Sequence, residues 1–323
     1  MRDRPRHPAR ERSALPCQSV RYRPRCAVTT GDGVVGVGRS SRAGMRRTMI
    51  SAGILAVALC GLTVGGRGLS PGAVQERLRV TALPLWAETI PDVPYGPHEE
   101  NRLDILRPRW RGPAPRAGVI VFHGGGWRHG TRQQMRDRVC RRYLERDFLV
   151  ANVDYRRGAE PAADDAVRAL EWFSARAASY GVDPQKIVLM GESAGAHLAL
   201  VAAFRSRVRP AAVVSFSGIS DLQALVHTSF VREALPAQGW ESAAQRLSPL
   251  AHVRGGLPPV LSVHGTADSL VPPDQAARLT SAIRAAGGEA ADLFIDGGGH
   301  GFTEAQLEMA YRAVFDFLTR HGM

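Results

Sequence analysis

Residues 187–195 read Ile-Val-Leu-Met-Gly-Glu-Ser-Ala-Gly. The apolar run at its start predicts a buried strand over residues 186–190. The pentapeptide Gly191-Glu192-Ser193-Ala194-Gly195 follows that strand directly and precedes a helix predicted over residues 197–204. A G-x-S-x-G sequence between a strand and a helix forms a tight turn that exposes its serine at the carboxyl end of a sheet. Ser193 is therefore a candidate nucleophile.

Strands and helices alternate on both sides of this turn. Further strands are predicted over residues 118–123, 148–154, 212–216, 259–264 and 293–295, with two earlier ones near 90–95 and 102–106. Further helices are predicted over residues 135–146, 162–180, 275–286 and 305–320. This alternation predicts an α/β domain over residues 85–323, with a mostly parallel central sheet and helices on both of its faces.

Residues 219–257 break the alternation, because they contain only short helical pieces near 221–226 and 231–235. Long irregular insertions between strands are usually functional. Two interpretations stay open for this segment: a small cap over the active site, or an excursion packed on the surface.

A second glycine motif, His123-Gly124-Gly125-Gly126-Trp127, follows the strand at 118–123, about 70 residues before Ser193. Glycines let the backbone approach a substrate carbonyl, and their N–H groups can donate to the oxyanion that forms during acyl transfer. We expect His123 to brace this loop, and Trp127 either to line the pocket or to pack.

A nucleophilic serine needs a base, and the base needs an acid that orients it. In this type of fold the chain order is serine, acid, histidine. Asp268 ends the sequence His-Gly-Thr-Ala-Asp after the strand at 259–264, and His300 lies in a glycine-rich loop after the strand at 293–295. Both residues fit that order, and we predict that Ser193, Asp268 and His300 form a catalytic triad.

Other titratable residues fit these roles less well. His264 lies in or beside a strand and is expected to be structural, and His227 and His252 fall in the insertion. Asp296 is too close in sequence to His300 to orient it, and Asp221 is the reserve acid. For Glu192 we expect a local hydrogen-bonding role and no proton transfer.

Together these motifs resemble the esterase side of the α/β-hydrolase superfamily over residues 88–320. The nearest branch is similar to kynurenine formamidases and bacterial feruloyl-esterase-like proteins. The resemblance rests on five sequences: Leu-Asp-Ile-Leu-Arg-Pro at 103–108, His-Gly-Gly-Gly-Trp at 123–127, Asp-Tyr-Arg at 154–156, Gly-Glu-Ser-Ala-Gly at 191–195 and His-Gly-Thr-Ala-Asp at 264–268. It implies the α/β-hydrolase fold and an oxyanion hole formed by the N–H groups of Gly125, Gly126 and Ala194.

Two related families differ from the chain at specific positions. The hormone-sensitive-lipase family shares the HGGG loop, but it usually has Asp where Glu192 stands, and its Asp-Pro-Leu run is absent here. The large cholinesterase-type esterases share the GESAG sequence, but they are far longer and typically use Glu as the acid.

Three functions are compatible with this reading. The first is a serine carboxylic-ester hydrolase that acts through an acyl-enzyme on Ser193. The second is an arylformamidase with the same triad, and the third, which the intact triad disfavours, is a catalytically silent hydrolase-fold binding protein. The expected partner is a small-molecule ester or amide, and neither a metal nor an organic cofactor is implied, since no Cys/His ligand spacing is present.

The basic charge of the chain lies mostly outside the predicted domain. The formal net charge is +12, and residues 1–48 carry 12 arginines against Asp3, Glu11 and Asp32. The other 275 residues are therefore nearly balanced, with 30 basic and 27 acidic side chains. No basic stripe on a folded element supports nucleic-acid binding. All but one of the basic residues are arginine, the exception being Lys186.

The amino-terminal residues predict export. Residues 1–44 are rich in Arg, Pro, Gly and Ser, which predicts a disordered basic tail or a start codon assigned too far upstream. Residues 45–69 begin with Met-Arg-Arg and continue into an apolar run over 49–66, which is typical of a signal peptide. An uncleaved membrane tether through 49–66 is the alternative, and a cytoplasmic protein follows if the signal is not functional. Cys17, Cys26 and Cys60 precede the domain, which holds only Cys140.

Overall fold

The computed structural model describes residue 83, residues 86–109 and residues 116–323, all of which belong to the second of two units of the chain, Arg67–Met323. The predicted basic tail, signal peptide and membrane tether lie outside the described residues, as do Cys17, Cys26 and Cys60. No helix in the described part of the chain is long and apolar enough to cross a membrane.

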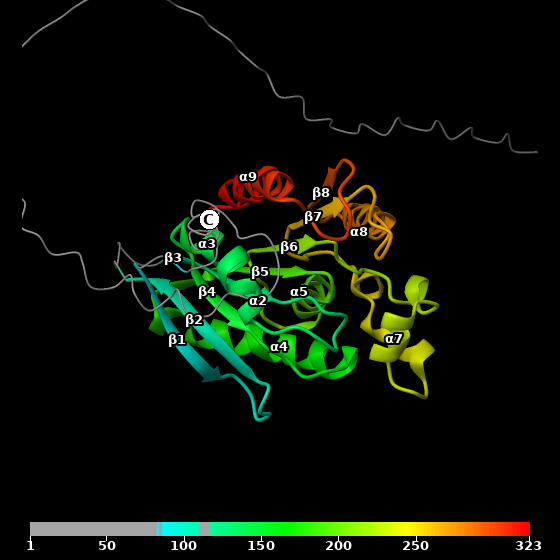
Figure 1. Cartoon of the computed structure of the whole chain (residues 1–323), viewed down its shortest axis with the longest axis horizontal. Coiled ribbons are helices and arrows are strands. Elements are labelled where there is room, and N and C mark those ends of the chain that lie inside the picture. Colours follow the sequence, from blue (N-terminus) through cyan, green and yellow to red (C-terminus); the bar gives the residue numbers. More distant parts are fainter. Residues whose placement is uncertain (1–82, 84–85, 110–115) are drawn as a thin grey trace, which may run out of the picture. The chain divides into compact units, whose positions relative to one another are not determined.

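An eight-stranded sheet forms the centre of this unit (Figure 1). Its strands are β1 (Ala87–Pro94), β2 (Arg102–Pro108), β3 (Arg116–Phe122), β4 (Leu149–Val153), β5 (Val182–Glu192), β6 (Ala212–Phe216), β7 (Val260–Gly265) and β8 (Ala290–Ile295). They lie in the order β1-β2-β4-β3-β5-β6-β7-β8. Strand β2 pairs antiparallel with both β1 and β4, and every other neighbouring pair is parallel. This is the mostly parallel sheet expected from the sequence, and it confirms the α/β-hydrolase fold.

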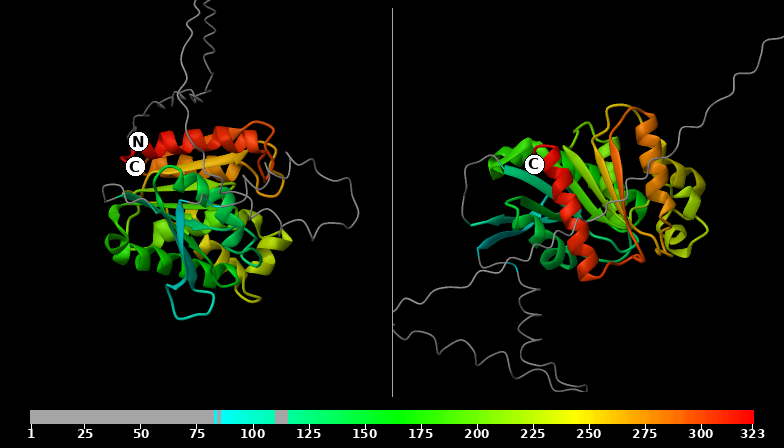
Figure 2. Two further views of the ribbon diagram at one scale, coloured as in Figure 1. Left: turned by 60° about the vertical axis from the view of Figure 1, so that its left-hand side comes forward. Right: turned by 90° about the horizontal axis from the view of Figure 1, so that it is seen from above.

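Helices cover both faces of the sheet. The longer ones are α4 (Ala159–Arg176), α5 (Ala194–Arg205), α8 (Asp274–Ala285) and α9 (Glu304–Arg320). One hydrophobic cluster joins the sheet to α4, α5 and α8, and a second joins it to α9 and to α3 (Arg141–Leu144). The left view of Figure 2 shows α9 above the sheet and α4 below it. The central strands are therefore buried on both sides, which explains their continuous apolar runs.

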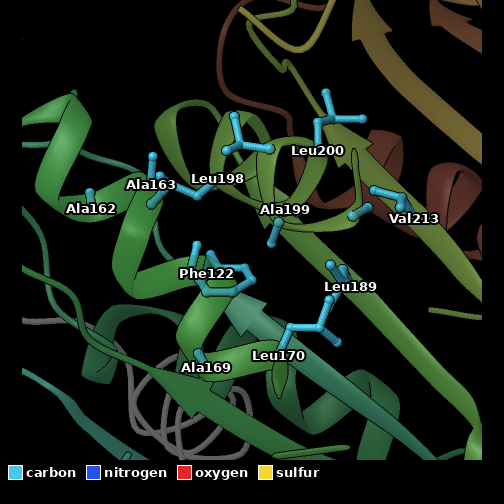
Figure 3. Close-up of a cluster of buried hydrophobic side chains, with 14 of the residues drawn as sticks. Phe122, Ala162, Ala163, Ala169, Leu170, Leu189, Leu198, Ala199, Leu200 and Val213 are labelled. Carbon is cyan, nitrogen blue, oxygen red and sulfur yellow. The ribbon is translucent and has the colours of Figure 1, made fainter. Parts of the chain in front are cut away.

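Small side chains let α4 and α5 pack closely on the sheet (Figure 3). Ala162 and Ala169 of α4 and Ala199 of α5 are fully buried beside Phe122 of β3 and Leu189 of β5. Because alanine adds little beyond its Cβ, the helix backbones approach and the larger strand side chains fill the space between them. This packing fixes α5, and with it the turn at Ser193 that precedes it.

The boundaries of several elements differ from the sequence predictions. Helix α4 begins three residues before the predicted start because Pro161 is tolerated in a first helical turn. The helix predicted over 135–146 is divided into α2 (Gln133–Met135), a π-helical turn η1 (Arg136–Cys140) and α3. Helix α5 begins at Ala194 instead of residue 197, directly after Ser193.

The segment 219–257 contains more helix than its sequence predicted. It forms η3 (Gln223–Leu225), α6 (Ser229–Ala234), α7 (Trp240–Leu247) and η4 (Pro249–His252). Helix α7 was not predicted, because only three of its residues are buried: Ala243, Ala244 and Leu247. These short elements pack on the same hydrophobic cluster as α4 and α5.

Candidate active site

The turn at Ser193 is strained and crowded. Ser193 has φ 54° and ψ −120°, a backbone conformation that residues other than glycine rarely adopt. Its N–H donates to the carbonyl oxygen of Phe216 at 2.8 Å. A Cβ on Gly191 would lie 2.2 Å from the backbone of Gly195, and a Cβ on Gly195 would lie 2.2 Å from the carbonyl oxygen of Phe122. Both glycines are therefore required by close backbone approaches on either side of the serine.

The structure brings together the three residues predicted as a triad. Ser193 Oγ lies 2.9 Å from His300 Nε2, and His300 Nδ1 lies 2.8 Å from Asp268 Oδ2. Because a carboxylate only accepts, Nδ1 carries the proton, so that Nε2 is free to accept from the serine hydroxyl. The residues follow β5, β7 and β8, whose carboxyl ends meet at one edge of the parallel sheet.

Asp268 is held by backbone donors of its own loop. Its side chain is fully buried, and Oδ1 accepts from the N–H groups of Leu270 at 3.0 Å and Val271 at 2.9 Å. His264 Nε2 donates to the carbonyl oxygen of Val271 at 2.9 Å and lies 3.4 Å from Asp268 Oδ2. Burial lowers the pKa of His264, which favours its neutral form. His264 thus supports the acid loop and does not reach Ser193.

The other candidate acids and bases have different partners. Asp221 pairs with Arg278 at 2.5 Å, and Asp296 accepts from the hydroxyl of Thr266 at 3.4 Å. His252 Nε2 lies 2.7 Å from the carbonyl oxygen of Arg246. The structure does not bring these residues into the hydrogen-bonded chain that ends at Ser193.

The loop at residues 123–127 folds tightly beside the serine turn. The carbonyl oxygen of Gly125 accepts from the N–H groups of Arg128 at 3.2 Å and His129 at 3.0 Å. Gly125 has φ +115°, and a Cβ there would lie 2.1 Å from the His129 carbonyl oxygen. Among the loop and turn hydrogen bonds of the described backbone, none has the N–H group of Gly125, Gly126 or Ala194 as its donor. A Cβ on Gly124 would lie 3.5 Å from the Cβ of Ser193.

His123 and Tyr155 hold this loop from behind. The Nδ1–H group of His123 donates to the carbonyl oxygen of Gly124 at 2.7 Å, and the Tyr155 hydroxyl donates to the carbonyl oxygen of His123 at 2.6 Å. The two rings stack, with their centroids 4.2 Å apart. Burial lowers the pKa of His123, so that a neutral imidazole is favoured there.

An ionic cluster that the sequence did not reveal follows the same loop. The buried guanidinium of Arg132 pairs with the carboxylates of Asp92, Asp104 and Asp154. Asp154 also accepts from the backbone N–H of Arg132 at 2.6 Å, and it lies 3.5 Å from His123 Nε2. The cluster therefore ties the end of the glycine loop to β1, β2 and the end of β4.

Trp127 packs, and it does not line the pocket at Ser193. Its side chain is 1% exposed, and its indole N–H donates to His197 Nδ1 at 3.1 Å. His197 Nε2 in turn donates to the carbonyl oxygen of Leu247, the last residue of α7, at 2.9 Å. The sequence contained a signal for His197, because it is the one polar residue in the run 194–204 that directly follows Ser193.

A pocket of about 660 Å³ opens at Ser193 and His300. Its apolar lining residues are Met135, Phe216, Phe230, Leu270, Phe302 and Leu307. Its lining arginines and glutamates form two ion pairs, Arg138 with Glu192 and Arg128 with Glu233, and His129 also lines it. Of these residues only Glu192 was predictable from the sequence, because the others belong to separate segments that only the tertiary fold brings together.

Within the described residues, no group of three or more His, Cys, Asp and Glu side chains is placed to hold a metal ion. The one cysteine described, Cys140, is buried and has a free thiol, whose pKa is raised by burial.

Comparison with known proteins gives consistent matches. The BD-FAE family model matches residues 103–283. Esterase LipQ from Mycobacterium tuberculosis is 29% identical over 72% of this chain and 62% of that protein. The probable isoprenylcysteine alpha-carbonyl methylesterase ICMEL1 from Arabidopsis thaliana is 27% identical over 69% of this chain and 52% of that protein. The chain thus spans between half and two thirds of the length of these relatives.

Solved structures agree with these matches. Esterase 2 from Thermogutta terrifontis has a TM-score of 0.59 at 27% identity, covering 72% of this chain and 95% of that one. A truncated carbohydrate esterase from gut microbiota has a TM-score of 0.63 at 24% identity, covering 75% of this chain and 98% of that one, a likeness of fold alone. The sheet order and these matches show an α/β-hydrolase fold. More narrowly, the chain belongs to the BD-FAE family.

Proposed function

We propose that this protein is a serine carboxylic-ester hydrolase with Ser193 as nucleophile, His300 as base and Asp268 as the acid that orients it. The observation that carries the proposal is the hydrogen-bonded chain from Ser193 Oγ through His300 to Asp268, which opens into a pocket of about 660 Å³. The relatives named as esterases support ester cleavage.

The proposed reaction has two halves. His300 Nε2 takes the hydroxyl proton as Ser193 Oγ attacks the ester carbonyl, and the protonated imidazole then gives that proton to the leaving alcohol. In the second half, His300 Nε2 takes a proton from a water molecule as that water attacks the acyl carbonyl, and the imidazolium then returns the proton to Ser193 Oγ as the acid is released. The negative oxygen of each tetrahedral intermediate accepts from the N–H groups of Gly125, Gly126 and Ala194, while the Asp268 carboxylate stabilises the imidazolium.

We further propose that the segment 219–257 acts as a small cap. Phe230 and Glu233 of α6 line the pocket, and Phe230 stacks on Trp127 with the ring centroids 6.5 Å apart. One structure of the Thermogutta esterase holds butyrate and another holds propionate. We therefore propose short acyl groups as the first substrates to examine.

The test uses the full chain and p-nitrophenyl esters from acetate to octanoate. We expect wild-type turnover, and a loss of at least about 10⁴-fold in kcat for Ser193→Ala, because a triad without its nucleophile retains little of its rate enhancement. Ser242→Ala is the matched control, since Ser242 is an exposed residue of α7 outside the pocket. Equal activity in wild type and Ser193→Ala contradicts the assignment of the nucleophile.

N-formylkynurenine is assayed in parallel, because an arylformamidase would use the same triad. A higher kcat/KM for this amide than for every ester identifies the formamidase alternative. No turnover of any substrate, together with no labelling of Ser193 by a fluorophosphonate, supports a silent binding protein.

A further inference from the structure

His197 is a buried polar residue whose two ring nitrogens are both bonded. It is fully buried in α5, between Ala196 and Leu198. Trp127 Nε1–H donates to Nδ1 at 3.1 Å, and Nε2 lies 2.9 Å from the carbonyl oxygen of Leu247. Because an indole only donates and a carbonyl only accepts, one neutral tautomer satisfies both contacts, with its proton on Nε2. Burying such a ring is costly unless both nitrogens are paired, and here they are.

Trp127, whose indole N–H donates to His197, has a strained backbone. Trp127 has φ +58°, which is rare for a bulky side chain and persists only when the surroundings impose it. Its carbonyl oxygen accepts from the N–H of Gly158 at 2.8 Å, and its ring is fixed by His197 and by stacking on Phe230. Trp127 directly follows Gly125 and Gly126, so its position sets the direction of the peptide groups before it.

His197 is also tied to the nucleophile turn. Its backbone N–H donates to the carbonyl oxygen of Ser193 at 3.1 Å. Through backbone and side chain together, one residue contacts the serine turn, the glycine loop and the end of α7. It does not line the pocket, so it acts through Trp127 and not on the substrate.

We propose that His197 is a positioning residue, which holds the N–H groups of Gly125 and Gly126 in register with Ser193 by accepting the hydrogen bond of Trp127. The proposal rests on the proposed esterase function. Donors aimed at a developing oxyanion lower the barrier to reaction only at the correct distance, and small displacements reduce the rate steeply. Loss of the Trp127–His197 bond should therefore lower kcat while leaving substrate binding nearly unchanged.

Three substitutions in the full chain separate the two hydrogen bonds of the His197 ring, the one from Trp127 and the one to Leu247. In His197→Asn the amide oxygen takes the place of Nδ1, so the acceptor for Trp127 is kept and the bond to Leu247 is lost. In His197→Gln the amide nitrogen takes the place of Nε2, so the bond to Leu247 is kept and the acceptor is lost. Trp127→Phe keeps a ring and removes the donor. His252→Gln is the matched control, because His252 also bonds a backbone carbonyl, that of Arg246, away from the glycine loop.

We expect His197→Gln and Trp127→Phe each to lower kcat for p-nitrophenyl acetate about tenfold, with KM within about threefold of the wild type. His197→Asn should keep kcat within about threefold. A trifluoromethyl ketone, whose adduct carries an oxyanion, should bind the Gln and Phe variants about tenfold more weakly.

These measurements distinguish a failure of this proposal from a failure of the proposed esterase function. An inactive wild type contradicts the esterase function itself. An active wild type with unchanged kcat in the Gln or the Phe variant, or with equal losses in the Asn and Gln variants, overturns the role of His197. If the Gln variant does not fold, as judged by circular dichroism, Trp127→Phe still tests the same bond. A loss in the Phe variant then supports the proposal, and wild-type kcat in that variant overturns it.

Discussion

The backbone of Ser193 stores strain that the fold must offset. For a residue with a Cβ, the conformation at φ 54° lowers the stability of the folded state by on the order of 1–3 kcal/mol, whereas glycine adopts this region freely. In this conformation Ser193 Oγ lies within hydrogen-bond distance of His300 Nε2, so the strained turn lowers stability at the same place where the proposed nucleophile meets its base.

We predict that Ser193→Gly is more stable than Ser193→Ala, although both remove the hydroxyl. Relief of the strain should exceed the extra chain entropy of glycine by about 1 kcal/mol, which corresponds to roughly 2–4 °C in Tm for a unit of this size. Thermal unfolding followed by circular dichroism compares the two. An alanine variant at least as stable as the glycine variant contradicts the idea that the turn is strained.

Gly195 should tolerate no side chain. A Cβ there would lie 2.2 Å from the Phe122 carbonyl oxygen, at the contact between β3 and the nucleophile turn. We predict that Gly195→Ala lowers the free energy of unfolding by at least about 2 kcal/mol, because the backbone must shift to relieve the clash. Gly255→Ala is the control, since Gly255 is exposed and its nearest neighbour would be 3.7 Å from an added Cβ. Equal urea midpoints for both variants contradict the prediction.

His197 makes stability depend on pH. Burial lowers its pKa from 6.5 to about 4, so between these values the unfolded chain binds more protons than the folded one. Unfolding therefore becomes easier as the pH falls through this window, by about 2 kcal/mol between pH 7.5 and pH 5 for this residue. Urea unfolding should show a smaller decrease for His197→Gln than for the wild type. The buried His123 and His264 remain in both proteins, so the difference isolates His197. If the free energy of unfolding decreases equally in the two proteins, His197 is not the source of the pH dependence.

At the scale of elements, the π-helical turn η1 places Arg138 over the nucleophile turn. Arg138 pairs with both carboxylate oxygens of Glu192, the residue before Ser193. Helix α3, which follows, is fixed to α9 because Arg142 pairs with Glu304 and Glu308. π-Helical turns of this kind frequently occur at functional sites, where they redirect a side chain.

We predict that Arg138→Ala lowers kcat about three- to tenfold, because it leaves the Glu192 carboxylate unpaired beside the place where negative charge develops. The double variant Arg138→Ala with Glu192→Gln should regain most of that loss. Steady-state kinetics of the two single variants and the double variant measure the coupling. Purely additive effects rule out charge compensation as the role of this pair.

The sequence predicted this sheet and its three catalytic candidates because each signal is local. Ser193, Asp268 and His300 each follow a predicted strand in a short loop with glycines, and parallel strands bring such loops to one edge. The pocket walls were not predictable in the same way. Arg138 lies on the π-helical turn η1, and Phe230 and Glu233 lie on the short helix α6, whose directions depend on tertiary packing. Helix α7 buries too few residues to show a periodic pattern.

At the scale of the whole molecule, two hydrophobic clusters share one sheet. Phe173 of α4 belongs to one cluster and Phe317 of α9 to the other, and both side chains are buried. Strands between them contribute side chains alternately to the two faces. Loss of packing in either cluster therefore exposes one face of the strands that also form the other cluster.

We predict a single thermal transition for the described unit, with loss of esterase activity at the same temperature as loss of circular dichroism. Phe173→Ala and Phe317→Ala should each lower the free energy of unfolding by about 3–5 kcal/mol, and the single Tm by roughly 6–20 °C. Scanning calorimetry of the two variants checks this. A second transition that moves with only one of the substitutions means that the faces unfold independently.

The arginine bias of the chain has a practical consequence for surface attachment. Lys186 is its only lysine, it is partly exposed, and it lies in the first half of β5, whereas Ser193 follows the last residue of the same strand. A strand rises about 3.3 Å per residue, so the backbone positions of Lys186 and Ser193 lie roughly 20 Å apart along the sheet. Apart from the terminal amine, amine-directed coupling to a solid support thus has one target. Molecules attached there share one orientation, with the pocket turned away from the support.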